Sequence, residues 1–396
     1  MASYPARAVV DLDAIRHNMR VLAGHAGSAE SMAIVKADAY GHGLLPVAQA
    51  ALDGGATWLG TAQLTEALAL RSAGITAPIL SWLYAPGAPL DRAVAADIDV
   101  SVAAPWALAE VVAAARAAGR PARVHVEVDT GLGRSGVFIS ELPDLLATAV
   151  RAQAAGEIAV VGVWSHLARA DEVGHPSVRD QAAVFAQAVQ ACERAGAAIE
   201  LRHLAASAAL LSEPWTCYDL VRPGIALYGL SPFPGRASSA DLGLRPAMRL
   251  EASLSVVKPA PAGQGVSYGH DYVTPRATRL AVVPIGYADG VPRHAGGSGP
   301  LQLGGRRLSV AGRICMDQFV VDLGPERAGD ARPDRAGDVA VLFGTGDDGE
   351  PTAQDWADAA GTISYEIVTR LGVRVPREYV GAAGPAASPQ EPEAAS

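Results

Sequence analysis

The chain has 396 residues, of which half are hydrophobic, and its formal net charge at pH 7 is -9. This length accommodates a barrel of about 250 residues and a second, smaller domain. The acidic balance without basic clusters argues against a nucleic-acid partner, and no apolar run reaches the roughly 18 residues of a membrane span. The first residues do not follow the pattern of a secretory signal. We therefore expect a cytoplasmic protein with a small-molecule partner.

Cysteines and lysines are both scarce. The cysteines at positions 192, 217 and 315 form neither an even disulfide framework nor a paired metal motif, so we expect free thiols and no metal site. Only Lys36 and Lys258 are lysines among the 32 basic residues, and all the others are arginine. A lysine at the end of an expected strand is therefore a candidate for a specific chemical role.

The N-terminal part predicts a helix followed by strand and helix alternation. In DLDAIRHNMRVLAG, Asp11 suits an N-cap, Gly24 suits the end of the helix, and one face carries Ile15, Met19 and Leu22. Amphipathic stretches such as GLLPVAQAAL and DQAAVFAQAVQAC separate most of the apolar runs that follow. The eight runs are SMAIVKA, WLGTA, PILSWL, DVSVA, ARVHVEVD, IAVVGVWSH, LRHLAA and LVRPGIALYG.

This alternation over residues 11–240 predicts an α/β fold, a closed (β/α)8 barrel of the TIM type, with an open doubly wound sheet as the structural alternative. After SPFPGRASSADLG the sequence pattern changes from strand and helix alternation to β-rich runs. Residues 241–382 therefore predict a smaller, mainly antiparallel β domain. Its runs are LEASLSVVK, RLAVVPIGY, RRLSVAGRI, QFVVDL and DVAVLFG, and the pair at 304–305 suits a tight hairpin turn. We expect residues 1–10 to pair with this domain and residues 383–396 to be a disordered tail.

The first candidate for chemistry is Lys36 in AIVKADAYGHG, at the end of the first expected barrel strand. The C-terminal ends of barrel strands carry the site, where desolvation lowers the pKa of a lysine and frees its amine as a nucleophile. This position suits a Schiff-base lysine. A lysine that extends from the strand end to solvent is the alternative.

Two further strand ends carry groups suited to anions. Arg134 stands in VDTGLGRSG, where three glycines permit a tight loop and the guanidinium can meet a carboxylate or a phosphate. In RPGIALYG, Arg222 precedes the amides of Gly224 and Ile225, at a position where barrels often bind phosphate, and the hydroxyl of Ser207 can join them. A surface arginine and a helix-capping serine are the alternatives.

His166 follows the sixth expected strand in VWSH, where its ring can stack on a planar ligand or lie satisfied in the core. In the second part of the chain, Tyr268 in VSYGHDY, Tyr287 in PIGYADG and the RICMDQ segment are polar or reactive residues inside β-rich loops. Aromatic packing is the alternative for both tyrosines.

Taken together, these motifs resemble the fold-type III alanine racemases over nearly the whole chain, and VKADAYGHG is the most specific of them. The resemblance implies pyridoxal 5'-phosphate as cofactor, bound covalently by Lys36. The implied cofactor contacts are Tyr40, Ser207, Gly224, Ile225 and Tyr365 at the phosphate, His166 near the ring, and Arg222 at the pyridine nitrogen.

The same resemblance implies interconversion of L-alanine and D-alanine by two bases, with Lys36 serving the D-alanine proton and Tyr268 the L-alanine proton. It further implies a homodimer whose active sites lie at the subunit interface, and a role in supplying D-alanine for peptidoglycan in the cell wall. The implied substrate contacts are Arg134 and Met316, with Tyr287 and Asp317 beside them in the entry region.

Two positions depart from the family pattern. Many members have a lysine that becomes carbamylated beside the arginine of the DTG motif, whereas this chain has Glu127 in VEVDTG. A carboxylate can supply that negative charge to Arg134 directly, so we expect no dependence on bicarbonate. The family's HAANS stretch is HLAAS here, so Ala206 replaces an asparagine amide.

Three rival functions remain. A fold-type III amino-acid decarboxylase shares the two-domain plan but lacks the tyrosine base, so VSYG and RICMDQ favour a racemase. A non-catalytic pyridoxal-phosphate carrier would lack the β domain. A racemase of broader amino-acid specificity stays open, because the motifs do not show the size of the substrate pocket.

Overall fold

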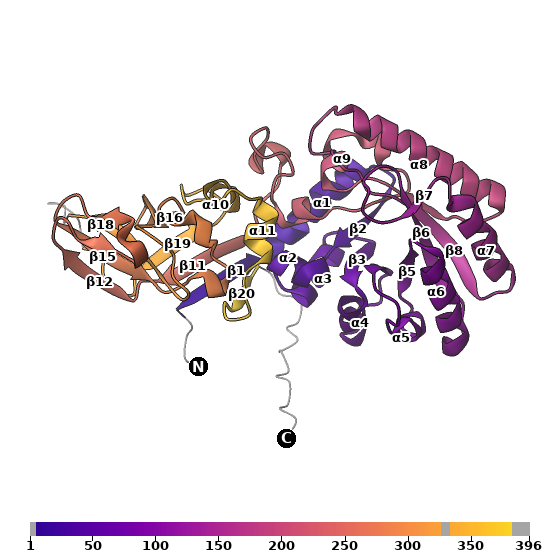
Figure 1. Cartoon of the computed structure of the whole chain (residues 1–396), viewed down its shortest axis with the longest axis horizontal. Coiled ribbons are helices and arrows are strands. Elements are labelled where there is room, and N and C mark those ends of the chain that lie inside the picture. Colours follow the sequence, from indigo (N-terminus) through magenta and orange to yellow (C-terminus); the bar gives the residue numbers. More distant parts are fainter. Residues whose placement is uncertain (1–4, 326–332, 382–396) are drawn as a thin grey trace, which may run out of the picture.

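The computed structural model describes residues 5–325 and 333–381, which form a barrel and a β-rich domain lying end to end (Figure 1). Eight parallel strands run through the barrel in the order β10-β2-β3-β4-β5-β6-β8-β9. A bridge between Ala206 and Arg222 brings the segments after β9 and β10 together, so the barrel is nearly closed. The strands are β2 (Glu30–Ile34), β3 (Trp58–Gln63), β4 (Ile79–Leu83), β5 (Asp99–Val102), β6 (Ala122–Asp129), β8 (Ile158–Trp164), β9 (Leu201–His203) and β10 (Leu220–Val221).

Helices surround this barrel and confirm the predicted alternation, so the open-sheet alternative is wrong. The short β7 (Val137–Phe138) pairs with the end of β6. The barrel helices are α1 (Leu12–Ala26), α2 (Lys36–Gly41), α3 (Leu44–Asp53), α4 (Leu64–Ser72), α5 (Leu90–Ala95), α6 (Pro105–Ala118), α7 (Leu142–Ala154), α8 (Pro176–Ala195) and α9 (Ser207–Ser212).

Helix α1 begins as the sequence predicts and ends later. The side chain of Asp11 caps it by accepting from the backbone N–H groups of Asp13 and Ala14, at 2.8 and 3.1 Å. The expected end at Gly24 is wrong, because the helix continues to Ala26 and ends at Gly27, whose φ of 65° breaks the helical path. The predicted face is buried at Ile15, Met19 and Leu22.

The described residues of the β-rich domain form three sheets. Strand β1 (Ala6–Asp11) lies between β11 and β20 in a six-stranded sheet of order β17-β16-β19-β11-β1-β20, in which only the β1–β20 pairing is parallel. The other sheets are β12-β15-β18 and β13-β14. Their strands are β11 (Met248–Ser253), β12 (Val256–Ala260), β13 (Gly265–Val266), β14 (Tyr272–Val273), β15 (Thr278–Val283), β16 (Pro300–Leu303), β17 (Arg306–Ser309), β18 (Phe319–Gly324), β19 (Val339–Phe343) and β20 (Arg377–Val380).

The predicted hairpin is present, since Gly304 and Gly305 join β16 to β17 with positive φ at both residues. The β-rich run LEASLSVVK is divided between β11 and β12, which belong to different sheets. The domain also contributes α10 (Ala353–Ala360) and α11 (Ser364–Thr369), and α11 packs against α2 of the barrel (Figure 1). The proposed tail at 383–396 lies outside the described residues.

None of the helices in the described ranges combines the length and the apolar character needed to cross a membrane. All three cysteines are free thiols; Cys192 and Cys217 are buried, while Cys315 is partly exposed.

Candidate active site

A cavity of about 540 Å³ opens at the C-terminal ends of the barrel strands, partly covered by α11 of the β-rich domain. It brings together residues that lie up to 335 positions apart in the chain, from Ile34 to Thr369. The residues predicted from the sequence that line it are Lys36, Tyr40, Arg134, His166, Ser207, Arg222, Gly224, Ile225 and Tyr365.

Lys36 enters this cavity immediately after β2. Its Nζ lies 5.7 Å from the centre of the Trp82 ring, which extends from the end of β4. The pKa of Lys36 is lowered, first by burial and then by the positive charge of Arg134, while Glu66 opposes the shift. These effects favour the neutral amine, the nucleophilic and proton-accepting form.

The turn that carries Lys36 is left-handed. Four successive residues from Ala37 to Tyr40 have φ of 52–54° and ψ of 38–53°, and none of them is glycine. Such a conformation costs roughly 1–2 kcal/mol per residue, so the turn must be held by its surroundings. Asp38 does this at one end, since its Oδ1 accepts from the N–H of Leu44 at 2.8 Å and its carbonyl from the N–H of Gly43 at 2.9 Å.

A cradle lined by hydroxyl groups occupies the side of the cavity nearest α9. The Oγ of Ser207 accepts from the N–H groups of Gly224 and Ala226, at 2.8 and 3.3 Å. A Cβ at Gly224 would lie 2.6 Å from the Oη of Tyr40, so only glycine leaves this space open. Burial raises the pKa of Tyr40 and raises that of Tyr365 to about 12, so both hydroxyls remain protonated donors for an anion.

Arg222 lies across the floor of the cavity. Its Nη2 donates to the carbonyls of Ser165 and Leu204, at 2.7 and 3.0 Å, and lies 3.4 Å from Nδ1 of His166. Its Nη1 lies 3.2 Å from Nδ1 of His203. The three contacts of Nη2 share its two N–H groups, and Nη1 uses one for His203, so the second N–H of Nη1 and the N–H of Nε remain as donors for the cavity that Arg222 lines.

Burial controls the charges of Arg222 and His166. It lowers the pKa of Arg222 to about 9, so the guanidinium is still mainly protonated at neutral pH. It lowers the pKa of His166 to about 3, helped by the charges of Arg222, Arg134 and Lys36, so the imidazole is neutral. Arg222 therefore contributes positive charge to the cavity, while the imidazole of His166 beside it is neutral. This combination suits an anionic ligand.

Arg134 and Glu127 do not form the direct pair expected from the sequence. Glu127 is buried on β6, and its Oε2 accepts from the hydroxyl of Ser135 at 2.7 Å, whereas Arg134 extends from the following loop into an exposed position. No ion pair joins these two described side chains. The loop is shaped by Asp129, whose Oδ1 accepts from the N–H groups of Gly131 and Gly133 at 2.8 and 3.2 Å. Glu127 therefore acts on Arg134 through space.

The remaining predicted residues lie in the β-rich domain and do not line the cavity of their own chain. Tyr268 is 71% exposed and Met316 53% exposed. Their segments adjoin, because the hydroxyl of Ser267 donates to the carbonyl of Arg313 at 2.7 Å. Beside them the N–H of Tyr287 donates to the carbonyl of Cys315 at 3.1 Å, and Arg374 forms an ion pair with Asp317 at 2.8 Å.

Sequence reasoning missed two tryptophans of the cavity wall, Trp82 and Trp164. The Cζ of Arg222 lies 5.0 Å from the centre of the Trp164 ring, and Lys36 lies over Trp82. Both tryptophans stand at the C-terminal ends of barrel strands, and that position was the available signal.

The fold and the cavity together define a class. The chain is a two-domain barrel enzyme whose site centres on a partly buried lysine of lowered pKa, with a positive, hydroxyl-lined cavity for an anionic group.

Comparisons with known proteins identify the family. A family model described as "Alanine racemase, N-terminal domain" matches residues 10–232, and "Alanine racemase, C-terminal domain" matches residues 247–379. The alanine racemase of Beutenbergia cavernae is 66% identical over 379 residues, covering 96% of this chain and 99% of that protein. The alanine racemase structure from D-cycloserine-producing Streptomyces lavendulae aligns with a TM-score of 0.94 and 54% identity, over 97% and 99% of the two chains.

The alanine racemase structure from Streptomyces coelicolor A3(2) aligns similarly, with a TM-score of 0.93 and 55% identity over 96% of this chain and 99% of that one. The chain belongs to the alanine racemase family and is therefore an amino-acid isomerase by descent.

Proposed function

We propose that this chain interconverts L-alanine and D-alanine with pyridoxal 5'-phosphate as cofactor, supplying D-alanine for peptidoglycan. The observation that carries the proposal is the position of Lys36, a partly buried lysine of lowered pKa that lines a positive cavity at the barrel mouth. Family membership supports the same activity.

The residues present fit the cofactor. The space beside Gly224 that a Cβ would fill, together with the hydroxyls of Ser207, Tyr40 and Tyr365, would accept its phosphate group. Arg222 would donate to its ring nitrogen and His166 would lie beside its ring, while the Lys36 amine would bind it covalently. When bound, pyridoxal phosphate accepts the electrons left behind when an amino acid loses its α-proton.

Two bases on opposite faces of the substrate would move that proton. Lys36 would serve the D-alanine side, and its lowered pKa favours the neutral amine that can accept a proton. Tyr268 would serve the L-alanine side. Arg134 and the backbone at Met316 would hold the substrate carboxylate, and Arg134 lines the cavity from the loop after β6.

Tyr268 and Met316 would come from a second copy of the chain. Both residues are exposed in the single chain and lie away from its own cavity, although the site needs a second base. A homodimer in which each β-rich domain completes the barrel mouth of the other chain would cover these exposed residues and would supply the second base. Such a closed, two-fold arrangement is the commonest form of a homo-oligomer.

The experiment is reconstitution of the purified protein with pyridoxal phosphate, followed by its absorbance spectrum and the conversion of L-alanine to D-alanine. The expected result is a cofactor band near the visible edge and racemisation, both lost in Lys36→Ala. A cofactor band without alanine racemisation, but with release of CO2 or turnover of another amino acid, would overturn the proposal in favour of a decarboxylase or a broader racemase.

A further inference from the structure

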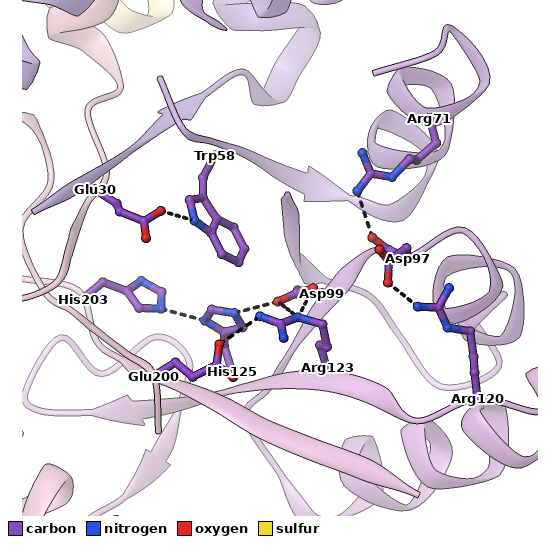
Figure 2. A network of polar contacts seen from close by, with 10 residues as sticks. All are labelled: Glu30, Trp58, Arg71, Asp97, Asp99, Arg120, Arg123, His125, Glu200 and His203. Atoms are coloured by element: carbon purple, nitrogen blue, oxygen red, sulfur yellow. Dashed lines mark hydrogen bonds and ion pairs between the residues drawn. The ribbon is translucent and has the colours of Figure 1, made fainter. Parts of the chain in front are cut away.

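The interior of the barrel contains a row of buried polar side chains that the proposed reaction does not use. Asp99 begins β5, His125 lies within β6 and His203 ends β9, with exposed fractions of 3%, 0% and 0%. Nε2 of His125 lies 3.1 Å from Oδ2 of Asp99, and its Nδ1 lies 2.9 Å from Nε2 of His203 (Figure 2). Because Nδ1 of His203 contacts Arg222, the row joins the N-terminal end of the barrel to the floor of the cavity.

The barrel provides space for this row. A Cβ at Gly162 of β8 would lie 2.1 Å from Nδ1 of His125, so the imidazole occupies a gap left by glycine. Trp58 packs edge-on against His125 with ring centres 5.7 Å apart, and Trp164 stacks on His203 with the ring planes 5° apart. Branched aliphatic residues usually fill such an interior. Buried polar groups here require a partner at every link.

The chemistry of the two ends fixes the direction of every hydrogen bond in the row. A guanidinium can only donate and a carboxylate can only accept, so Nδ1 of His203 must be the acceptor for Arg222. The proton of His203 then resides on Nε2 and is donated to Nδ1 of His125, whose own Nε2–H is donated to Asp99. Any other arrangement sets two N–H groups face to face. Burial and the charge of Arg222 keep the pKa of His203 well below its ordinary value, which favours this neutral form.

We propose that Asp99 and His125 are positioning residues, which act through His203 to fix the guanidinium of Arg222 against the ring nitrogen of the cofactor. This inference rests on the proposed function, since that function places the ring nitrogen there. His203 holds Nη1 while the carbonyls of Ser165 and Leu204 hold Nη2, so the guanidinium plane is fixed from two sides. The hydrogen bonds of the row also couple the negative charge of Asp99 to the buried guanidinium of Arg222, which Asp99 does not contact.

The first test is ¹⁵N NMR of the histidines in the wild-type protein, with and without pyridoxal phosphate. The expected result is a neutral His125 and a neutral His203, each with its proton on Nε2 and a bare Nδ1. A proton on Nδ1 of His203, or an imidazolium at either residue, would overturn the proposal. This readout does not depend on activity, so it stands even if the protein fails to racemise alanine.

The second test compares Asp99→Asn with Glu200→Gln in the reconstituted enzyme. Arg123 contacts both carboxylates, Asp99 at 3.1 Å and Glu200 at 3.4 Å, so the control removes a charge from the same end of the barrel without touching the histidines. Asp99→Asn should lower kcat about tenfold, leave KM for alanine within about twofold and shift the absorbance maximum of the bound cofactor. Glu200→Gln should change none of these.

An unchanged kcat and spectrum in Asp99→Asn, or an equal loss in Glu200→Gln, would contradict the role of the row. If Asp99→Asn does not fold, the NMR measurement on the wild-type chain still decides. A wild-type enzyme that binds the cofactor and lacks racemase activity would instead refute the proposed function.

Discussion

At the scale of single residues, burial and mutual repulsion set the chemistry of the cavity. Lys36, Arg134 and Arg222 share one small space, and burial together with the neighbouring charge lowers the pKa of Lys36. These three residues could be predicted from the sequence because each follows a recognisable barrel strand. Asp99 and His203 could not, because their roles depend on contacts between strands far apart in the chain.

Glu127 supplies a residue-scale prediction. Its carboxylate carries charge near Arg134 without needing CO2, although burial raises its pKa against the opposing effects of Ser135, Arg134 and Arg222. Stripping CO2 from the buffer should leave racemisation by the wild-type enzyme unchanged. Glu127→Gln should lower kcat/KM by about tenfold, which is about 1.4 kcal/mol of transition-state stabilisation.

The measurement is the racemisation rate in degassed buffer, before and after bicarbonate is added. Ser140→Ala, an exposed change beyond the same loop, serves as a control and should behave as wild type. Restoration of the stripped wild-type enzyme by bicarbonate would contradict Glu127 as the sole source of this charge.

At the scale of elements, the sequence predicted the positions of the helices and strands well. It did not predict the left-handed turn after β2 or the residue at which α1 ends. The left-handed turn from Ala37 to Tyr40 escaped prediction because the usual marker of positive φ is glycine, which none of these four residues provides. Helix α1 passes Gly24 because a glycine inside a helix costs only about 1 kcal/mol, and tertiary burial of the helix face outweighs this. The conformational propensities of single residues therefore predict neither the left-handed turn nor the continuation of α1 past Gly24.

Gly41 and Gly24 give a matched pair for stability. Gly41 ends the left-handed turn with φ of 78°, and a Cβ there would lie 2.3 Å from the carbonyl oxygen of Val368, so Gly41→Ala should lower the free energy of unfolding by at least about 2 kcal/mol. Gly24 is helical with open space around it, so Gly24→Ala should raise that free energy by about 0.5–1 kcal/mol. Denaturant unfolding of both variants checks this. Equal effects of the two substitutions would show that the turn is not strained at Gly41.

At the scale of the whole molecule, each chain has the proposed cofactor cavity in its barrel and, exposed on its other domain, the proposed second base Tyr268. The alternation of strands and helices was enough to predict the barrel and the β-rich domain. It could not predict that LEASLSVVK divides between two sheets, since this depends on which partner strands pack against it. Nor could it show that Tyr268 would be exposed on its own chain.

The measurement that tests the central claim most directly is complementation between two inactive variants, Lys36→Ala and Tyr268→Phe. After the two proteins are unfolded together and refolded with pyridoxal phosphate, a mixed dimer holds one site with both bases intact. Random pairing should then restore about a quarter of wild-type racemase activity, whereas each variant refolded alone should stay nearly inactive. Absence of any recovery, with mixed dimers present, would contradict the assignment of Lys36 and Tyr268 to one active site shared by two chains.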